Sequence, residues 1–235
     1  AHHGLIEEKR LLPIRLIYGY YPEIITHPGE EKDRLKALTD SFLYKDILLW
    51  ENIQKPDKLL RLMQALAFQV GQQVSYNELA TLVGLDHKTV EKYINLLEQV
   101  FVIYRLGTFS RNLRNELKSS RKIYFYDNGI RNALIAAFQP IELRQDIGAL
   151  WENWILSERI KYLKYHQQWT NNYFWRSTQQ KEIDYIEEMD GKIAAYEFKW
   201  NPKRKTTFPK TFTDQYHPDI AEVITPGNFE PFVGV

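Results

Sequence analysis

The sequence contains no cysteine, which excludes disulfide bonds, cysteine-ligated zinc sites and thiol nucleophiles. It also lacks long apolar runs, because stretches such as Ala133–Phe138 fall far short of the roughly 20 residues that a membrane-spanning helix needs. No secretory signal peptide is visible at its start. The six histidines follow no recognised metal-ligand spacing. We therefore expect a globular, cytoplasmic protein with no membrane segment.

The composition is that of a folded chain. Of the 235 residues, 44% are apolar and 26% are charged, which excludes a disordered protein. At roughly 100–200 residues per domain, this length predicts one large domain or two to three small ones. The chain starts at Ala1 without an initiator methionine, so we expect either added residues or an internal fragment at this end.

The net charge is only +1, from 31 basic and 30 acidic residues, but the charges are distributed unevenly. The segment Arg105–Lys122 holds six bases and one acid, and Lys199–Lys210 holds five bases and no acid. Local basic patches indicate a polyanionic partner such as DNA, although two solvated loops would give the same pattern.

Residues 57–121 have the pattern of a winged helix-turn-helix, after a helical lead-in over residues 1–56. An amphipathic helix is predicted over Leu59–Val70, a short second helix follows a capping signal, and a third helix is predicted over His87–Gln99. The helix-capping residues are Ser75, Glu78 and Asp86. Three helices, a glycine-containing turn and a following strand are typical of this fold.

The outer face of the third helix and the basic wing after it are the candidate DNA-binding surface. The residues we expect to contact DNA are Lys88, Lys92, Asn95, Arg111 and Arg114. Winged helices are also used for protein contacts, and Glu91 in the middle of this face weakens the attraction to DNA. Both interpretations remain open at this point.

Residues 122–235 have an α+β pattern that includes a β-hairpin with Asp190 and Gly191 as its two-residue loop. This loop places Asp184 opposite Glu197 in the neighbouring strand. It also places Glu182 opposite Lys199 on the same face. The residues predicted on the opposite, core face are Ile183, Tyr185, Tyr196 and Phe198.

Two opposed carboxylates repel each other and destabilise a hairpin, unless a cation lies between them or one of them is protonated. Oxygen ligands without cysteine or histidine favour Mg²⁺ or Mn²⁺. Lys199, on the same face, can orient a water or stabilise charge on a phosphate. These groups together suit metal-assisted phosphodiester hydrolysis. The alternative is a surface salt-bridge ladder between Glu182 and Lys199.

Asp184 and the sequence Glu197-Phe198-Lys199, with Glu152 on a preceding helix, resemble the PD-(D/E)xK nuclease superfamily. The resemblance implies a restriction-endonuclease-like α/β/α domain with a mixed sheet. It also implies that Glu152, Asp184 and Glu197 hold Mg²⁺ or Mn²⁺ and that Lys199 is the catalytic lysine.

The wider sequence is similar to a bacterial and archaeal family of AAA-type ATPases that carry a winged helix and a nuclease-like domain after the ATPase core. The stretches that carry this similarity are Tyr18–Glu23, Ser41–Ile47, Lys122–Asp127, Phe174–Ser177 and Glu182–Tyr185. No phosphate-binding loop is present in this sequence. The resemblance therefore implies that ATP binds in an N-terminal core outside this chain, of which residues 1–56 are the end.

Three functions follow as hypotheses. The chain is a metal-dependent nuclease acting on DNA, or an inert nuclease fold that binds DNA or protein and regulates the ATPase, or a protein-interaction module. Arg176 is expected either on phosphate or in a salt bridge to Glu182. Most tryptophans have the spacing of core residues, and Trp200, next to Lys199, is the one candidate for base stacking.

Overall fold

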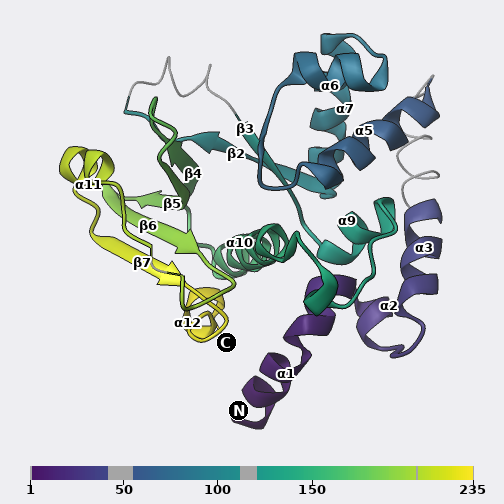
Figure 1. The fold of residues 1–235 in the computed structure, drawn as a ribbon, viewed down its shortest axis with the longest axis horizontal. Coiled ribbons are helices and arrows are strands. Elements are labelled where there is room, and N and C mark those ends of the chain that lie inside the picture. Colours follow the sequence, from purple (N-terminus) through teal and green to yellow (C-terminus); the bar gives the residue numbers. More distant parts are fainter. Residues whose placement is uncertain (1, 42–54, 112–120, 205, 235) are drawn as a thin grey trace. The chain divides into compact units, whose positions relative to one another are not determined.

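The computed structural model describes residues 2–41, 55–111, 121–204 and 206–234. The chain forms two compact units, one of residues 1–105 and 122–146 and the other of residues 106–121 and 147–235. Helices and a mixed sheet make up these units, as the α+β prediction requires (Figure 1). Within the described residues, no helix is long and apolar enough to cross a membrane.

The first unit contains the lead-in helices and the winged helix. Its helices are α1 (His2–Tyr18), α2 (Pro22–Ile25), α3 (Glu31–Ser41), α5 (Pro56–Phe68), α6 (Tyr76–Val83), α7 (His87–Gln99), α9 (Asn128–Leu134) and the short 3₁₀ helix η2 (Ile141–Leu143). Its strands are β1 (Gln73–Val74), most of β3 (Arg121–Phe125) and the first half of β2 (Ile103–Thr108).

The capping signals in the sequence form the expected helix ends. The Ser75 hydroxyl accepts a hydrogen bond from the Glu78 amide at 3.4 Å, and Asp86 accepts one from the Thr89 amide at 3.0 Å. Gly84 ends α6 with a φ of +66°, a conformation that favours glycine. The inner face of α7 is fully buried through Val90, Ile94 and Leu97. These contacts confirm the helix-turn-helix.

The third strand of the winged helix is β3, which the sequence pattern places at the start of the nuclease-like domain. The strand order is β1-β3-β2. The Gly71 amide donates to the Ile123 carbonyl at 3.1 Å, and the Tyr126 amide donates to the Val102 carbonyl at 3.1 Å. The boundary expected between residues 121 and 122 therefore differs from the observed one, since residues 122–146 belong to the first unit.

The lead-in packs tightly against the start of α9. A Cβ atom on Gly19 would lie 2.1 Å from a carboxylate oxygen of Asp127, and Gly19 has a φ of +75°. Asp127 accepts hydrogen bonds from the amides of Tyr20 at 2.7 Å and Ile130 at 3.1 Å. Two of the stretches that carry the family resemblance, Tyr18–Glu23 and Lys122–Asp127, thus meet here.

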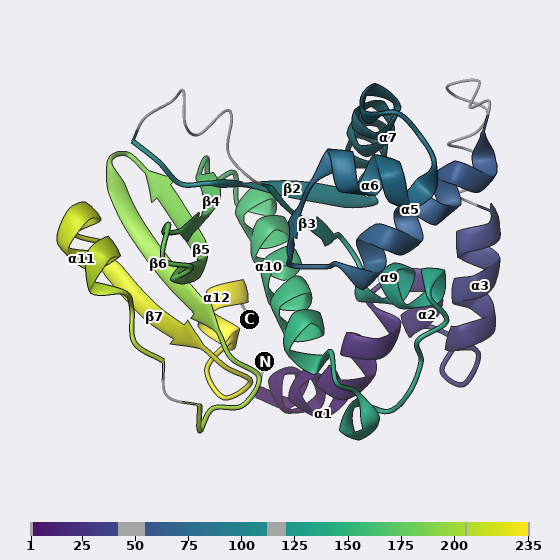
Figure 2. The same cartoon turned by 45° about the horizontal axis from the view of Figure 1, so that its top comes forward.

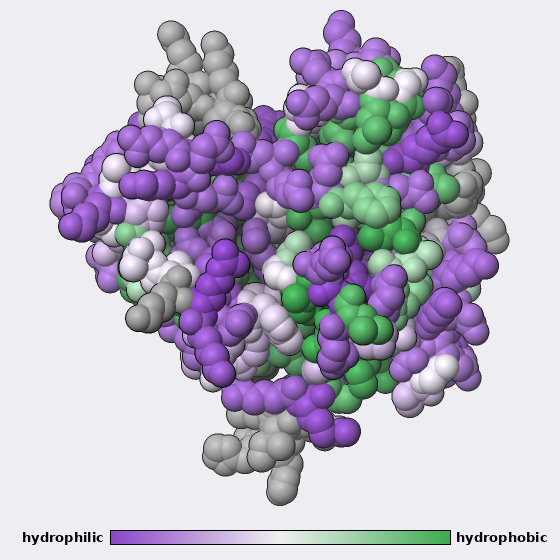
Figure 3. Space-filling view, viewed as in Figure 1, coloured by the Kyte–Doolittle hydropathy of each residue, from purple (hydrophilic) through white to green (hydrophobic). Residues whose placement is uncertain are grey.

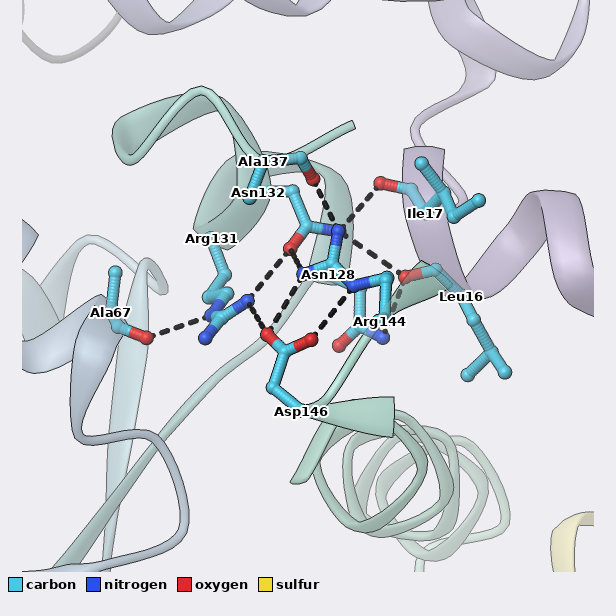
Figure 4. A network of polar contacts seen from close by, with 9 residues as sticks. All are labelled: Leu16, Ile17, Ala67, Asn128, Arg131, Asn132, Ala137, Arg144 and Asp146. Carbon is cyan, nitrogen blue, oxygen red and sulfur yellow. Dashed lines mark hydrogen bonds and ion pairs between the residues drawn. The ribbon is translucent and has the colours of Figure 1, made fainter. Parts of the chain in front are cut away.

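A buried polar network extends this junction (Figure 4). Arg131 donates to the Ala67 carbonyl at the end of α5 at 2.7 Å and pairs with Asp146 at 2.7 Å. Asn132 donates to the Ile17 carbonyl of α1 at 2.8 Å. Burial disfavours charge on Asp146, but hydrogen bonds from Arg144 and Arg131 outweigh it and lower its pKa. The network joins the lead-in, the winged helix and α9 in one unit.

The second unit is a mixed sheet with helices on both faces. Its strands are the end of β2, β4 (Asn171–Arg176), β5 (Glu182–Met189), β6 (Lys192–Phe198) and β7 (Ile220–Ile224), and its helices are α10 (Ile147–Tyr165), α11 (Lys210–Tyr216) and α12 (Glu230–Val233). The strands β4, β5 and β6 pair antiparallel in that order. At the two ends of this group, β2 pairs parallel with β4 and β7 pairs parallel with β6.

Each face of this sheet has its own apolar core. Ile183, Ile186 and Ile193 pack with Phe212 and Tyr216 of α11, whose outer side is hydrophilic (Figure 3). On the other face, the rings of Tyr185, Tyr196 and Phe198 surround Phe232 of α12. α10 lies on this second side, opposite α11 (Figure 2). The layered α/β/α arrangement that the nuclease resemblance implies is therefore present.

Candidate functional site

The predicted trio of charged residues meets at the end of the β5–β6 hairpin that is remote from its turn. The Lys199 ammonium donates to a Glu197 oxygen at 2.6 Å and to an Asp184 oxygen at 3.1 Å. The side chains of Asp184 and Glu197 are 13% and 7% exposed. The prediction that the two acids lie together with Lys199 is confirmed.

The hairpin register explains this meeting. Tyr185 pairs with Tyr196 and Met189 with Lys192, as the two-residue loop predicts. Beyond Tyr185, the Asp184 carboxylate accepts a hydrogen bond from the Phe198 amide at 2.8 Å. This backbone donor, which has no signal in the sequence, fixes the orientation of Asp184.

A β-bulge on the other edge of β5 corrects one prediction. Tyr173 pairs with Ile186, but Trp175 pairs with Ile183, so β5 has one more residue than β4 in this interval. The extra residue turns Ile183 toward the α11 cluster instead of the face of Tyr185, where strict alternation places it. The face predicted to be charged is therefore an apolar core near the turn and polar only at its end.

Glu182 lies in the ladder opposite Arg176 of β4, and the two side chains form an ion pair at 3.7 Å. Of the two roles expected for Arg176, the salt bridge is thus the one the structure shows. The Lys199 ammonium lies at hydrogen-bond distance from both Asp184 and Glu197. The ladder between Glu182 and Lys199, with Asp184 nearby, stays an alternative prediction.

Burial and mutual charge shift the pKa values of two members of the trio, Glu197 and Lys199. Burial raises the pKa of Glu197 to about 7, the charge of Asp184 adds to this effect, and the hydrogen bond from Lys199 opposes it. Burial disfavours the charged form of Lys199, but the charges of Asp184 and Glu197 outweigh it and raise its pKa. Lys199 therefore stays an ammonium, while Glu197 is easily protonated.

Glu152 lies near the start of α10 and is half-buried. The ring of its neighbour Trp151 is 5.9 Å from the ring of Trp200, which directly follows Lys199. This turn of α10 is therefore close to the end of β6. Among the described residues, however, no group of three acids or histidines is close enough to hold a metal ion. The role of Glu152 as a third ligand stays a prediction.

The predicted DNA-binding face of α7 is open to solvent. Lys88, Glu91 and Lys92 are exposed, and Asn95 is half-buried. A shallow pocket of about 300 Å³ on this face is lined by Lys88, Glu91, Lys92, Asn95, Leu96 and Gln99. The charge of this face is mixed, because Glu91 lies between the two lysines.

Two of the described basic residues after α7 are held within the fold. Arg105 forms an ion pair with Glu98 and also contacts the Tyr76 hydroxyl, and Lys122 is only 2% exposed. Arg111 is exposed, with its guanidinium 6.0 Å from the centre of the Tyr216 ring in α11. Arg114 lies outside the described residues.

Comparison with known protein families agrees with one of the unit boundaries, the one at residues 146 and 147, whereas residues 106–121 of the second unit lie within the first family match. Residues 9–141 match the family described as "Domain of unknown function (DUF8612)", which is more than half of the chain. The chain belongs to the DUF8612 family. Residues 147–232 match a second family, "Domain of unknown function (DUF4143)". The interval between the DUF8612 and DUF4143 segments contains the boundary at residues 146 and 147 between the two units.

Several longer bacterial proteins are similar to part of this chain. Uncharacterized proteins of Mycobacterium bovis and Mycobacterium tuberculosis are each 28% identical over 136 residues, which is 57% of this chain and 30% of each relative. An uncharacterized protein of Haemophilus influenzae is 27% identical over 124 residues, 50% of this chain and 31% of the relative. The matched segments thus span about a third of these proteins. No solved structure matches the chain.

Proposed function

We propose that this chain is the C-terminal part of an AAA-type ATPase that binds DNA through α7 and cleaves phosphodiester bonds, with a divalent cation, at Asp184, Glu197 and Lys199. The observation that carries the proposal is the contact of Lys199 with both carboxylates at the end of two adjacent strands. Asp184 and the Glu-x-Lys spacing are the elements that the nuclease superfamily shares.

The donor set suits a hard cation. Asp184 and Glu197 offer carboxylate oxygens close together, and burial, followed by the charge of Asp184, raises the pKa of Glu197 to about 7. Mg²⁺ or Mn²⁺ would be held by these two residues, with Glu152 as the expected third ligand. Such an ion supplies positive charge for the scissile phosphate and lowers the pKa of a bound water.

The chain's own residues then have distinct tasks. The Phe198 amide holds Asp184 in place through its 2.8 Å hydrogen bond. The Lys199 ammonium, released from one carboxylate, can neutralise charge that develops on a phosphate oxygen. α7 supplies Lys88, Lys92 and Asn95 for the DNA backbone and bases.

Plasmid nicking in Mg²⁺ or Mn²⁺ tests the enzymatic part. We expect the 235-residue chain to nick DNA, and we expect Asp184→Asn and Lys199→Ala each to lower the rate at least a hundredfold, because removing single electrostatic groups costs about 10²–10³ in rate. Lys192→Ala and Glu188→Gln, near the turn of the same hairpin, are the matched controls and should nick like the unmodified chain. Equal rates in all variants would reject the assignment.

An inert nuclease fold is the second candidate, and one observation favours it. Within the described parts of the chain, no group of three acids or histidines is close enough to hold a metal ion. The domain would then bind DNA or protein and regulate the ATPase. Absence of nicking, together with salt-sensitive DNA binding by gel shift, would support this alternative.

The ATPase part of the proposal is supported by the lead-in. In its Tyr18–Glu23 stretch, Gly19 lies close to Asp127 and the Tyr20 amide donates to the Asp127 carboxylate, so two of the motifs that resemble the ATPase family are in contact. The much greater length of the relatives leaves room for an ATPase core outside the matched segments. Detection of ATP hydrolysis by the full-length protein, and its loss on mutation of a phosphate-binding loop, would test this part.

A further inference from the structure

Trp200 occupies an unusual position in the second unit. It directly follows Lys199 in the bend after β6 and is half-buried. The backbone there is anchored because the Lys199 amide donates to the Ile224 carbonyl of β7 at 2.9 Å. One end of the strand therefore presents the candidate catalytic ammonium and an indole ring on consecutive residues.

The ring of Trp200 rests on a rigid aromatic support. The Trp151 ring lies 5.9 Å away at an angle of 59° and is fully buried. Trp151 in turn stacks on Trp154 at 5.4 Å and meets the edge of Phe229 at 5.9 Å. A partly exposed aromatic ring held by such a cluster loses little side-chain freedom when a ligand stacks on it.

The support contains an unsatisfied polar atom. The indole nitrogen of Trp151 is buried and has no hydrogen-bond partner among the described residues. A buried donor without an acceptor is destabilising by about 1–3 kcal/mol, and buried tryptophans normally have a partner. Trp151 itself is 0% exposed, so it supports the Trp200 ring from beneath and leaves Trp200 as the ring that a ligand can reach.

Two cationic residues lie in the turn that follows Trp200. Lys203 and Arg204 are exposed in the turn after Trp200, and the Asn201 side chain fixes this turn by accepting a hydrogen bond from the Lys203 amide at 3.0 Å. An aromatic platform beside a cationic backbone-binding loop is the combination that binds single-stranded nucleic acid. Paired bases in a duplex are already stacked on each other and cannot use such a platform.

We propose that Trp200 is a base-stacking subsite and that the DNA bound at this site has an unpaired nucleotide next to the phosphate held by Lys199. This inference rests on the DNA-binding part of the proposed function and names its substrate class, single-stranded or frayed DNA. The phosphate and the base then lie on the two consecutive residues at the end of β6.

An oligonucleotide without bases separates stacking from backbone attraction. Fluorescence anisotropy in EDTA, where metal-dependent cleavage cannot occur, compares labelled oligo(dT) with an abasic strand of equal length. We expect the unmodified chain to bind oligo(dT) about tenfold or more tightly than the abasic strand, since stacking contributes about 1–3 kcal/mol per base. Trp200→Ala should abolish that preference.

Two further variants distinguish the loss of base stacking from a folding defect. Trp200→Phe keeps a ring and should retain most of the preference, whereas Trp200→Leu keeps only apolar packing and should lose it. Trp169→Ala is the matched control, because Trp169 in the same unit is 90% exposed and should leave binding unchanged. Equal binding of both strands by the unmodified chain would overturn the stacking subsite but leave DNA binding intact. No binding of either strand would overturn the DNA-binding proposal as well.

Discussion

The folded protein favours the neutral form of Glu197, because burial and the nearby charge of Asp184 raise the pKa of this carboxyl group to about 7. A neutral Glu197 therefore stabilises the fold. That stability is fully present below the ordinary glutamate pKa and is lost as the pH rises through about 7. A bound cation would favour the ionised form of this buried carboxylate, so the site is suited to a positively charged ligand.

Replacing Glu197 by glutamine should therefore stabilise the metal-free protein while abolishing cleavage. We expect Glu197→Gln to raise the free energy of unfolding at about pH 8 by about 1–3 kcal/mol and to have little effect at about pH 4.5. Urea unfolding in EDTA at the two pH values measures this difference.

Glu187→Gln on the same hairpin provides the opposite control. Glu187 is buried and forms a 2.6 Å ion pair with Arg159, so its loss leaves a buried guanidinium uncompensated and should be destabilising. Destabilisation of similar size by both substitutions would mean that Glu197 is an ordinary structural ion-pair partner.

The sequence predicted the Asp184–Glu197 pair because the Asp190–Gly191 turn alone fixes the register of the hairpin. It could not predict the bulge that redirects Ile183, since a bulge arises from pairing with β4, a strand outside the hairpin. Nor could it predict the Phe198 amide as the partner of Asp184, because every residue of this strand offers the same backbone donor.

At the scale of elements, α7 was the most predictable part of the fold. Its Asp86 cap and its stripe of Val90, Ile94 and Leu97 define the helix and its buried face from local signals alone. The partner of β3 was not predictable, because an apolar strand fits equally well beside β2 or in a separate sheet. The exposed lysines of α7 remain the candidate DNA contacts.

Removing two of these lysines should weaken DNA binding uniformly across sequences. We expect Lys88→Ala with Lys92→Ala to lower duplex affinity and to reduce the slope of log affinity against log salt by about two, because each lysine neutralises one phosphate. Lys32→Ala with Lys36→Ala on α3 removes the same charge from the same unit and serves as the control. Identical salt slopes in the two double variants would argue that α7 contacts protein instead of DNA.

At the scale of the whole molecule, the observed units cross the boundaries drawn from sequence patterns. The lead-in and the winged helix form one unit through the Arg131, Asn132 and Asp146 network. Local periodicity identifies helices and strands, but it does not show which of them share a core. The DUF8612 and DUF4143 segments follow the unit boundary more closely than the predicted domains do.

The central claim is that Asp184 and Glu197 hold a divalent cation. Anomalous diffraction from crystals of this chain soaked in Mn²⁺ tests it most directly, with Asp184→Asn crystals as the control. The account predicts a manganese peak in contact with both carboxylates, with the Lys199 ammonium displaced from at least one of them. Crystals in which Lys199 still bridges the two carboxylates, with no manganese beside them, would contradict it.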